Sequence, residues 1–568
     1  MAPILNRPLP AARARPAARG RVATLVARAD RAWAWLAGAY ARRPATFVTA
    51  AAAVAFVVRL AATPFDVPAN LDVHAYALKA REIAAGDLTP IRTHAIGWSL
   101  LLAPFVWLVR DAPMMTVLNA TRIVASAVDA LALLPFAVLA RETLDPRARP
   151  LALAFCPFAL LLVRMAVRGF SEPLLTLLFV GTVAGVLVGR RSRSALVAGA
   201  CAAGLACWVH PTGVVVLAIA ALLAAVTGGR GRRVAALAIV AAIATVVAAP
   251  AAIQRARAFD GPFDYGANTR FFIENRSDVW SPHVPAPGWR EYLASQPTAR
   301  ILERFVVRGA GATLWDFATD VVHAPVAPFV AYGAWQAVRA PALRPILVAL
   351  GVFLLSWMPV YELYGTGRHL SPALPLALIL AAAGIEALAR ARRHAGVWML
   401  AAAVAFAGGE SVAAGVQRQR ALQGEEIDGL VWGRWAAEHV RGRLALSKGH
   451  ELVMMHVPDA RIGGADIFTM SAPRTGLGLI RPGHFTTLDE AFAWMRGHGV
   501  SHLLVDALHD AGTSYAPLLS ASDLPPFLVE RYASAPGSRW PVRVFEIRWE
   551  RYEPGRVDRA GSAAGAHR

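Results

Sequence analysis

The chain has 568 residues, of which 56% are hydrophobic and 17% are charged, and its mean hydropathy is +0.44. Soluble domains carry roughly 25% charged residues, so this composition excludes an ordinary soluble protein. Lys and Arg number 58 against 38 Asp and Glu, for a formal net charge of +20. Nearly all of the excess is arginine, with Lys only at positions 79 and 448. We interpret this as composition bias and expect no nucleic-acid partner.

Residues 1–43 are an Arg-rich tail, and its first twenty residues contain no apolar stretch of the signal-peptide type. We therefore expect no cleavable signal, and an uncleaved anchor in the first apolar run, which begins at Pro44. Arginines also cluster between the later apolar runs, near residues 147–149, 190–193, 230–233, 339–344 and 390–393. By the positive-inside tendency, the tail and these clusters belong in the cytoplasm.

Apolar runs recur from residue 44 to residue 409, which predicts an α-helical polytopic membrane protein with about eleven transmembrane helices. They lie near residues 44–63, 115–140, 150–163, 172–189, 195–209, 212–227, 234–252, 318–338, 345–361, 370–388 and 396–409. A further run at 95–109 would move every later Arg cluster to the opposite side if it crossed. We expect it to lie along or dip into the outer interface, with Trp98 and Trp107 at headgroup depth.

This topology places the loops 64–114 and 253–305 and the C-terminal residues outside the cytoplasm. In the first loop, "DVHAYALKAREIAAG" predicts a short amphipathic helix with Asp72 as its N-cap, closed by Gly86. Val73, Tyr76 and Ala80 would lie on its apolar face.

Residues 410–555 contain no apolar run of spanning length and predict a small extracytoplasmic α/β domain. The stretch "LDEAFAWMRGHGV" has helical spacing, whereas "ELVMMHV", "HLLVDAL" and "PVRVFEIRW" have the length and composition of strands. No nucleophile–base or metal-ligand spacing stands out, so we expect support or acceptor docking rather than chemistry there. Residues 556–568 are expected to form a disordered tail.

Ionisable side chains at the outer ends of the apolar runs are the candidate site, because charges at such positions are costly. They combine one acidic cluster with cations and imidazoles that face one compartment: Asp72, His94, Arg168, Glu172, His210, Arg368 and His369. This combination suits a reaction with an anionic, lipid-tethered substrate. Tyr265 and Asn268 in the second outer loop suit sugar contacts, although an ordered lid is an equally good interpretation of that loop.

These segments resemble the polytopic C-superfamily (GT-C) glycosyltransferases, notably the protein O-mannosyltransferase and aminoarabinose-transferase branch. The resemblance covers roughly residues 44–550 in order and topology, and it is carried by "DVHAYALKAREIAAGD", "NATRIVAS", "GFSEPLL", "HPTGVVVLAI" and "GRHLSPALPLALI". Many members have an acidic pair where Asp72-Val73 stands, and Tyr where His369 follows Arg368. The resemblance therefore does not fix the sugar.

The resemblance implies that Asp72 is the general base and that the donor is a polyprenyl-phosphate sugar. The implied reaction is an inverting hexosyl or pentosyl transfer, at the outer face of the bacterial plasma membrane, to a lipid, polysaccharide or protein acceptor. A phosphate-linked sugar departs as a stable anion, so one carboxylate with nearby cations suffices. A water-exposed Asp has a pKa of roughly 3.9 and is a weak base, so partial burial would have to raise its basicity.

Arg368 is the first candidate for holding the donor phosphate, because a guanidinium grips two oxygens in a fork. His369, His94, His210 and Arg168 are second-rank candidates for the same anion. Tyr76 and Glu172, with Tyr265 and Asn268, are candidates for sugar or acceptor contacts. No metal cluster or cofactor is implied, and a divalent-metal requirement stays open.

Each candidate also has a purely structural alternative. Asp72 could serve only as a helix cap, and Arg368 could anchor a helix end at lipid headgroups. Glu172 could hydrogen-bond within the bundle, and His210 before Pro211 could be a turn residue.

Two other functions fit the same side chains: a transporter or flippase for a polyprenyl-linked glycan, and a ligase that moves a whole glycan. A transporter favours paired repeats and charges near the bilayer midplane. Here the charges gather at the outer ends and a domain is appended, which favours the enzyme. The ligase shares the outer-face logic and stays open.

Overall fold

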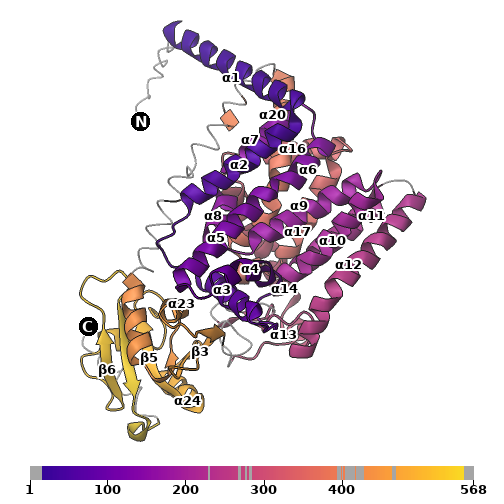
Figure 1. Ribbon diagram of the computed structural model, residues 1–568. Helices are drawn as coiled ribbons and strands as arrows, with labels where there is room; N and C mark the ends of the chain where they lie inside the picture. The colour runs from indigo at the N-terminus through magenta and orange to yellow at the C-terminus, as the bar shows by residue number, and fades with distance from the viewer. Residues whose placement is uncertain are drawn as a thin grey trace, which may run out of the picture.

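A helical bundle carries a smaller domain, built on a β-sheet, at one of its ends (Figure 1). The structure is a computed structural model, and it describes residues 16–227, 230–266, 270–274, 278–279, 284–392, 398, 401–402, 416, 428–462 and 468–554. Asn268 and most of the run 396–409 lie outside the described residues.

The first half of the bundle runs from α1 to α12, and Ala, Val and Leu dominate its helices. The elements are α1 (Pro16–Arg42), α2 (Pro44–Ala62), α3 (Leu71–Ala84), α4 (Gly97–Leu108), α5 (Met114–Leu131), α6 (Leu133–Thr143), α7 (Arg149–Phe155), η1 (Cys156–Phe158), α8 (Leu160–Arg168), α9 (Glu172–Val188), α10 (Arg193–Val209), α11 (Gly213–Val226) and α12 (Arg230–Ala258).

The second half of the bundle contains shorter and more irregular helices. They are α13 (Trp289–Ser295), α14 (Thr298–Leu302), η4 (Glu303–Arg308), α15 (Gly309–Asp316), η5 (Phe317–Val321), α16 (Ala327–Arg339), α17 (Arg344–Trp357), α18 (Tyr361–Tyr364), α19 (Gly367–Leu370), η6 (Ser371–Ala373) and α20 (Leu374–Arg392). The sequence predicted one continuous span from residue 318. That prediction is wrong, because the chain turns at His323, whose φ is 69°, before α16 begins.

Four described helical stretches are long and apolar enough to cross a membrane: Pro44–Ala62, Met114–Thr143, Gly231–Ala258 and Gly367–Ala391. The pair Arg149–Phe158 and Leu160–Arg168, bent by 44°, makes a fifth if it is one span. Five further apolar helices are shorter, among them α9, α10, α11 and α17. The chain therefore has the helices of a multi-pass membrane protein, and the number eleven stays a prediction.

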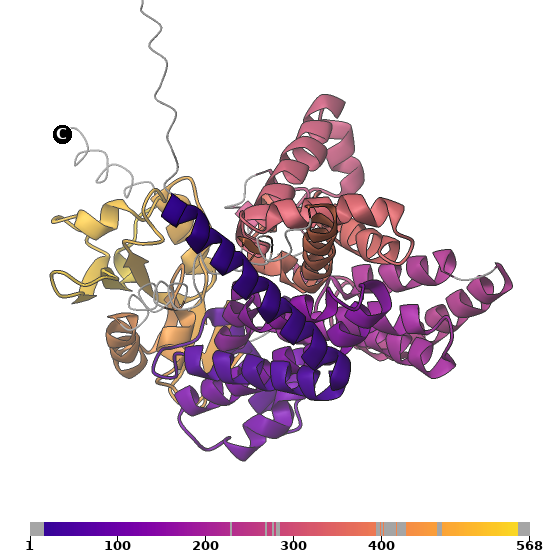
Figure 2. The same ribbon diagram turned by 90° about the horizontal axis from the view of Figure 1, so that it is seen from above.

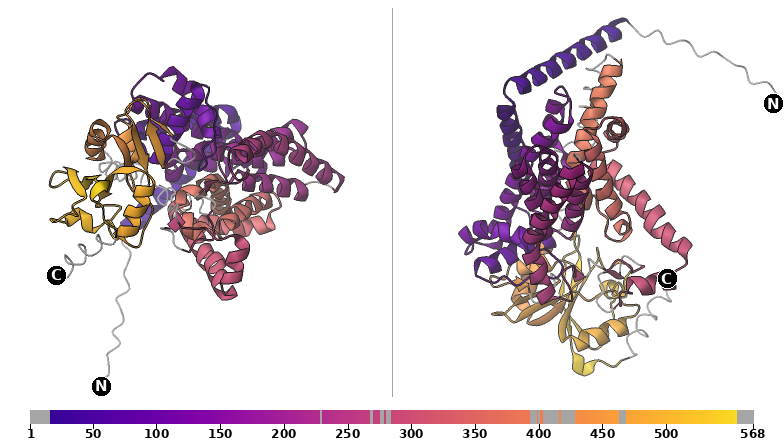
Figure 3. Two further views of the ribbon diagram at one scale, coloured as in Figure 1. Left: turned by 90° about the horizontal axis from the view of Figure 1, so that it is seen from below. Right: turned by 90° about the vertical axis from the view of Figure 1, so that its right-hand side faces the viewer.

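One end of the bundle gathers several of the predicted cytoplasmic Arg clusters. The indole nitrogen of Trp33 in α1 donates to the carbonyl of Arg147 at 3.0 Å, which ties α1 to the loop before α7. Arg191 pairs with Glu142, and Arg390 pairs with Asp145 at 2.8 Å. Figure 2, a view from above, shows α1 lying across this end. The right panel of Figure 3 places the sheet domain at the opposite end.

The loop between α2 and α5 differs from the sequence prediction in two respects. Every residue of α3 from Val73 to Ala80 is buried, so this helix is enclosed rather than amphipathic. In α4, Trp98 is completely buried and its indole nitrogen donates to the carbonyl of Gly169 at 3.1 Å. The prediction of an interfacial Trp98 is therefore wrong, whereas Trp107 is half exposed.

The smaller domain is built on a mixed seven-stranded sheet with the strand order β2-β3-β4-β1-β5-β7-β6. Its elements are β1 (Gly442–Ala445), α23 (His450–Met454), β2 (Arg461–Ile462), β3 (Thr469–Ala472), β4 (Leu477–Ile480), α24 (Leu488–Gly497), β5 (Val500–Asp506), α25 (Pro517–Ser520), β6 (Leu528–Ala533), β7 (Val542–Ile547) and η7 (Trp549–Arg551). The predicted helix and the last two predicted strands are present as α24, β5 and β7. The stretch "ELVMMHV" is wrongly predicted, because it forms helix α23 and the turn after it.

The sheet domain contacts the bundle through α3. Arg81 donates to the carbonyl of Pro458 at 3.2 Å, and Glu82 accepts a hydrogen bond from the amide of Ile462 at 3.1 Å. In addition, Ala75 and Ile91 pack with Ile462 and Phe468. The helix that carries Asp72 is thus also the helix on which the domain rests.

Candidate active site

Asp72 lies in the first turn of α3, and its carboxylate does not cap the helix. The N-cap is Asn70, whose side chain accepts a hydrogen bond from the Asp72 amide at 2.9 Å. The prediction that Asp72 caps the helix is therefore wrong. Because Asn70 satisfies the helix end, the Asp72 carboxylate can contact residues from other elements.

The Asp72 carboxylate contacts two cationic or titratable side chains from distant parts of the chain. Its Oδ2 lies 2.8 Å from Nη2 of Arg368 in α19, and its Oδ1 lies 3.5 Å from Nε2 of His94. The Nε of Arg368 in turn lies 3.3 Å from Oε1 of Glu172, the first residue of α9. We call these four residues the ion network. It joins α3, the segment before α4, α9 and α19.

The ion network decides the protonation of Asp72. Burial by itself would raise the pKa of this carboxyl, but the Arg368 guanidinium and the His94 ring outweigh burial and hold the pKa well below its usual range. The expectation that burial makes Asp72 a stronger base is wrong for the ion-paired carboxylate. In this state Asp72 is ionised, because the positive charge of Arg368 stabilises the negative charge of the carboxylate.

Arg368 is fixed by aromatic packing as well as by charge. Its guanidinium carbon lies 4.6 Å from the centre of the Phe170 ring, in the turn between α8 and α9. Gly169, at φ 86°, ends α8, and a side chain there would meet Val73 and Thr121 at just over 3 Å. A left-handed glycine therefore lets this turn approach α3 and brings Phe170 and Glu172 up to Arg368.

A row of rings continues from the ion network. His369 stacks on Trp357 with centroids 5.0 Å apart and an interplanar angle of 4°. His210 lies 6.3 Å from His369, and its Nδ1 shares a hydrogen bond with the Thr212 hydroxyl at 2.7 Å. His369 and His210 thus lie beside Arg368, and their contact with a donor phosphate stays a prediction.

The other predicted site residues are placed less uniformly. Tyr76 packs edge-on against His94 at 4.9 Å, and its hydroxyl lies 3.2 Å from that of Ser171. Arg168 is half-buried in the last turn of α8, two residues before Phe170. Tyr265 is buried beneath the Arg255 guanidinium, whose central carbon lies 3.7 Å from the ring centre. This packing gives Tyr265 a structural contact.

Sequence reasoning missed Phe170 and Trp357, which pack against the two ends of the Arg368-His369 pair. Phe170 had a weak signal, since it lies in the "GFSEP" motif two residues before Glu172. Trp357 had none, because an apolar run gives no indication of which of its aromatics meets a distant histidine. Within the described part of the chain, no group of three or more His, Cys, Asp or Glu side chains is arranged to hold a metal ion.

The ion network lies at the domain-bearing end of a helical bundle that has several helices apolar enough to cross a membrane. The chain has the GT-C fold, and comparison with solved structures supports this. No protein-family model and no curated protein sequence matches the chain.

Two solved structures illustrate the likeness. The chain is similar to the archaeal oligosaccharyltransferase AglB from Archaeoglobus fulgidus, in complex with an inhibitory peptide and a dolichol-phosphate, with a TM-score of 0.56 and 13% identity over 90% of this chain and 75% of that one. It is also similar to ArnT from Cupriavidus metallidurans bound to undecaprenyl phosphate, with a TM-score of 0.52 and 15% identity over 88% and 98%. At such identities the likeness establishes the fold.

Proposed function

We propose that the protein is an integral-membrane glycosyltransferase that transfers a sugar from a polyprenyl-phosphate donor to an acceptor with inversion. The observation that carries the proposal is the contact between Asp72 and Arg368, a carboxylate and a guanidinium 2.8 Å apart at one end of the bundle. The solved structures with this fold support the donor class, since one holds dolichol-phosphate and another holds undecaprenyl phosphate.

In the proposed reaction, Arg368 holds the donor phosphate and Asp72 receives a proton. The acceptor hydroxyl oxygen bonds to the anomeric carbon, the bond from that carbon to the phosphate oxygen breaks, and the hydroxyl proton passes to Asp72. Polyprenyl phosphate leaves as an anion, so its oxygen needs no proton from the protein.

Donor binding would also activate the base. In the structure Arg368 holds the pKa of Asp72 down. A phosphate that shares the guanidinium weakens this hold, and burial then raises the carboxyl's basicity. Asp72 is thus a stronger base only when donor is bound. In the resting protein it stays ion-paired with Arg368.

The remaining candidates have supporting roles in this proposal. His369, His210, His94 and Arg168 surround the phosphate held by Arg368, and Tyr76 and Glu172 contact the sugar or acceptor. Tyr265 and Asn268 stay proposals for the same side of the site. The acceptor is a lipid, a polysaccharide or a protein, and the sugar is a hexose or a pentose.

The arrangement of the bundle supports an assignment to the bacterial plasma membrane with the site on the outer face. The Arg clusters and α1 share one end, while the ion network and the sheet domain lie at the other (Figure 1). By the positive-inside tendency the first end is cytoplasmic. The C-terminal domain is then extracytoplasmic.

The decisive experiment is Asp72→Asn, assayed in membranes supplied with labelled polyprenyl-phosphate mannose or polyprenyl-phosphate aminoarabinose. We expect transfer from lipid to acceptor to fall by about 100-fold to 10,000-fold, the contribution of a general base, with unchanged protein level. Asp66→Asn, the same change at an exposed position of the same loop, should keep full activity. Equal activity of both variants would remove Asp72 from the mechanism.

A vesicle assay separates the enzyme from a flippase. Labelled donor in proteoliposomes without acceptor should stay in its original leaflet, because a transferase moves a sugar and not the lipid. Movement of the donor between leaflets would favour transport instead.

A further inference from the structure

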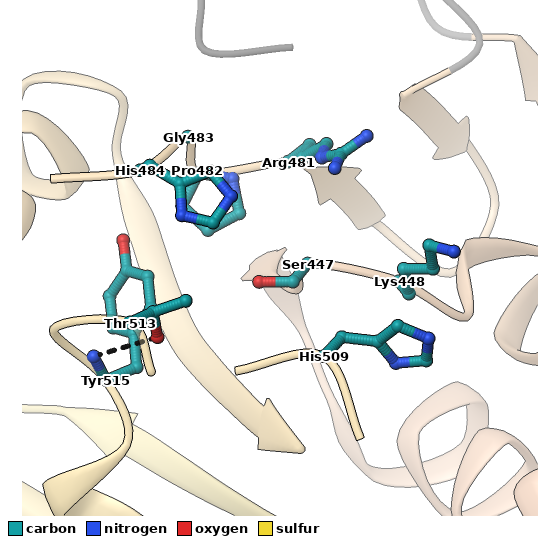
Figure 4. Close-up of a pocket in the computed structure, with 9 residues that line it drawn as sticks. All are labelled: Ser447, Lys448, Arg481, Pro482, Gly483, His484, His509, Thr513 and Tyr515. Carbon is teal, nitrogen blue, oxygen red and sulfur yellow. Dashed lines mark hydrogen bonds between the residues drawn. The ribbon is translucent and has the colours of Figure 1, made fainter. Parts of the chain in front are cut away.

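The sheet domain contains a pocket at a place that favours ligands in α/β sheets. Strands β4, β1 and β5 are parallel neighbours in the sheet, with β1 between the other two. The pocket is lined by residues that follow the carboxyl ends of all three strands (Figure 4): Ser447 and Lys448 after β1, Arg481 to His484 after β4, and His509, Thr513 and Tyr515 after β5. Ligands in open α/β sheets bind outside the carboxyl ends of such strands.

The lining is cationic and rich in hydroxyl groups. Lys448, Arg481, His484 and His509 contribute nitrogen donors, and Ser447, Thr513 and Tyr515 contribute hydroxyls. Lys448 is one of the two lysines of the chain, and among the described residues it forms no ion pair. Its ammonium group is therefore available to an anion from outside.

Two buried acids, Asp506 and Asp510, hydrogen-bond to residues of the lining. The Asp510 carboxylate accepts from the Ser447 hydroxyl at 2.6 Å and from the Asp506 amide at 2.8 Å. The Asp506 carboxylate accepts from the amide of His509 at 2.7 Å, and its Oδ1 lies 2.9 Å from the His509 Nδ1. The acids thus orient Ser447 and His509 toward the pocket.

Tyr515 supplies an independent sign of a ligand. Its side chain is only 2% exposed, and within the described residues its hydroxyl has no hydrogen-bond partner. Figure 4 shows the hydroxyl end of the ring on the side of His484, within the pocket. A buried hydroxyl without a partner is costly, and an acceptor atom of a ligand would satisfy it.

We propose that this pocket binds the anionic group, a phosphate or a carboxylate, of a small sugar-sized ligand. Its volume of about 140 Å³ is well above the ~15 Å³ that one water needs and below the ~300 Å³ of the smallest drug-sized pockets. Four nitrogen-bearing side chains fit the anion, and three hydroxyls fit its oxygens or those of an attached sugar. The site does not depend on the proposed transfer reaction.

The pocket is also connected to the helix that carries Asp72. The guanidinium carbon of Arg481 lies 4.8 Å from the centre of the Phe468 ring. Phe468 packs with Ala75 of α3 and with Ile91. A ligand held by Arg481 therefore lies two side-chain contacts away from α3.

The test is calorimetric titration of the purified full-length protein in detergent with inorganic phosphate and, separately, with D-glucuronate. We expect saturable binding of at least one probe, and the probe that binds identifies the anionic group. Lys448→Ala should weaken binding roughly tenfold or more, and Tyr515→Phe roughly threefold or more. Arg474→Ala removes the same charge from an exposed position of the same domain outside the pocket, and should leave binding unchanged.

Three results would overturn the proposal: no saturable binding of either probe, equal weakening by Arg474→Ala, or unchanged affinity in both pocket variants. Phosphate bound at Arg368 would be indifferent to Lys448→Ala, so the loss caused by this variant isolates the pocket from the proposed active site. Lys448 is exposed and its removal should leave the melting temperature of the chain unchanged, which excludes unfolding as the cause.

Discussion

Arg368 forms ion pairs with two acids at once, and this decides what its removal costs. Its side chain is 27% exposed, while the Asp72 and Glu172 side chains are 20% and 4% exposed. Two carboxylates this close together repel each other strongly when the cation between them is gone. The guanidinium is therefore needed for stability as well as for the proposed grip on phosphate.

We predict that Arg368→Gln lowers the free energy of unfolding by about 3 kcal/mol, at the low end for a broken buried pair because Arg368 and Asp72 are partly exposed. Adding Glu172→Gln should recover part of this loss, with a coupling of roughly 1 kcal/mol or more. Unfolding in mixed micelles measures both. Arg308→Gln breaks an exposed pair with Glu362 and should cost less than about 1 kcal/mol. Additive losses for the pair of changes would contradict the network.

Asp510 gives the sheet domain a pH dependence opposite to that of a salt-bridged Asp. Burial raises the pKa of this carboxyl from 3.8 to about 6. Between these values the folded chain binds more protons than the unfolded chain, so the contribution of Asp510 to stability falls as the pH rises. The free-energy penalty for burying the ionised Asp510 carboxylate is absent below about pH 4 and fully present above about pH 6.

We therefore predict that Asp510→Asn raises the melting temperature of the full-length protein at pH 7, and that this gain shrinks as the pH falls to 5 and below. The gain corresponds to about 1 to 3 kcal/mol, because the folded and unfolded pKa values differ by about two units. The hydroxyl of Ser447 can rotate to accept from the new amide, which preserves that contact. Thermal unfolding of both proteins across this pH range is the measurement. A gain that is the same at pH 5 and pH 7 would rule out Asp510 as the titrating group.

Helices α16 and α20 pack closely against each other because glycines lie at their contact. A side chain at Gly333 would lie 1.8 Å from the carbonyl oxygen of Leu380, and one at Gly384 would lie 2.3 Å from that of Phe329. The two backbones therefore touch, as is common where membrane helices pack through small residues. This contact fixes the position of α20. It therefore also fixes α19, the short helix before α20 that carries Arg368.

We predict that Gly333→Ala destabilises the chain by about 1 to 3 kcal/mol, because the helices must separate. Gly351→Ala in α17 is the matched control, since no atom lies within 4 Å of its added carbon. It should be neutral or stabilising by up to ~1 kcal/mol, as expected for Ala replacing Gly in a helix. Unfolding in mixed micelles compares the two variants. Equal effects of both would show that the α16–α20 contact is not close in solution.

The two ends of the molecule carry different groups. The arginine clusters lie at one end, and the ion network and the sheet domain lie at the other (Figure 3). The domain rests on α3 through Glu82 and Arg81, so its position and that of Asp72 are set by the same helix. If the bundle crosses a membrane, α1 and the sheet domain face opposite compartments.

We predict that a membrane-impermeant maleimide labels Arg474→Cys in intact cells, but labels Arg28→Cys only after the cells are opened. Both positions are exposed, one in the sheet domain and the other in α1. The unmodified chain is the control, because Cys156, Cys201 and Cys207 all lie in apolar segments. Labelling of both variants from the same side would contradict the topology.

The residues of the candidate site were predictable to the extent that they are charges in energetically costly positions. Asp72, Glu172 and Arg368 stand at the ends of apolar runs, and the cost of such charges singles them out without any knowledge of their neighbours. The protonation of Asp72 was not predictable, because burial and ion pairing shift its pKa in opposite directions. The distances from the Asp72 carboxylate to Arg368 and His94 decide which effect is larger.

The sheet domain was less predictable than the bundle. Strands β1 and β4 have four residues each, too few for alternation to identify them, and their parallel pairing joins segments far apart in the chain. Helix α24 was predictable because its capping box and apolar spacing are local, with Thr487 and Glu490 forming the box. The pocket at the strand ends could not be seen without the strand order.

By itself the sequence determined the class of this protein, the order of its apolar helices and the charged residues at their ends, because hydropathy and the cost of a buried charge are local properties. Tertiary structure alone decided that Arg368 neutralises Asp72 and that three strand ends form a cationic pocket. These outcomes depend on distances between residues remote in the chain, and electrostatic energies vary steeply with such distances.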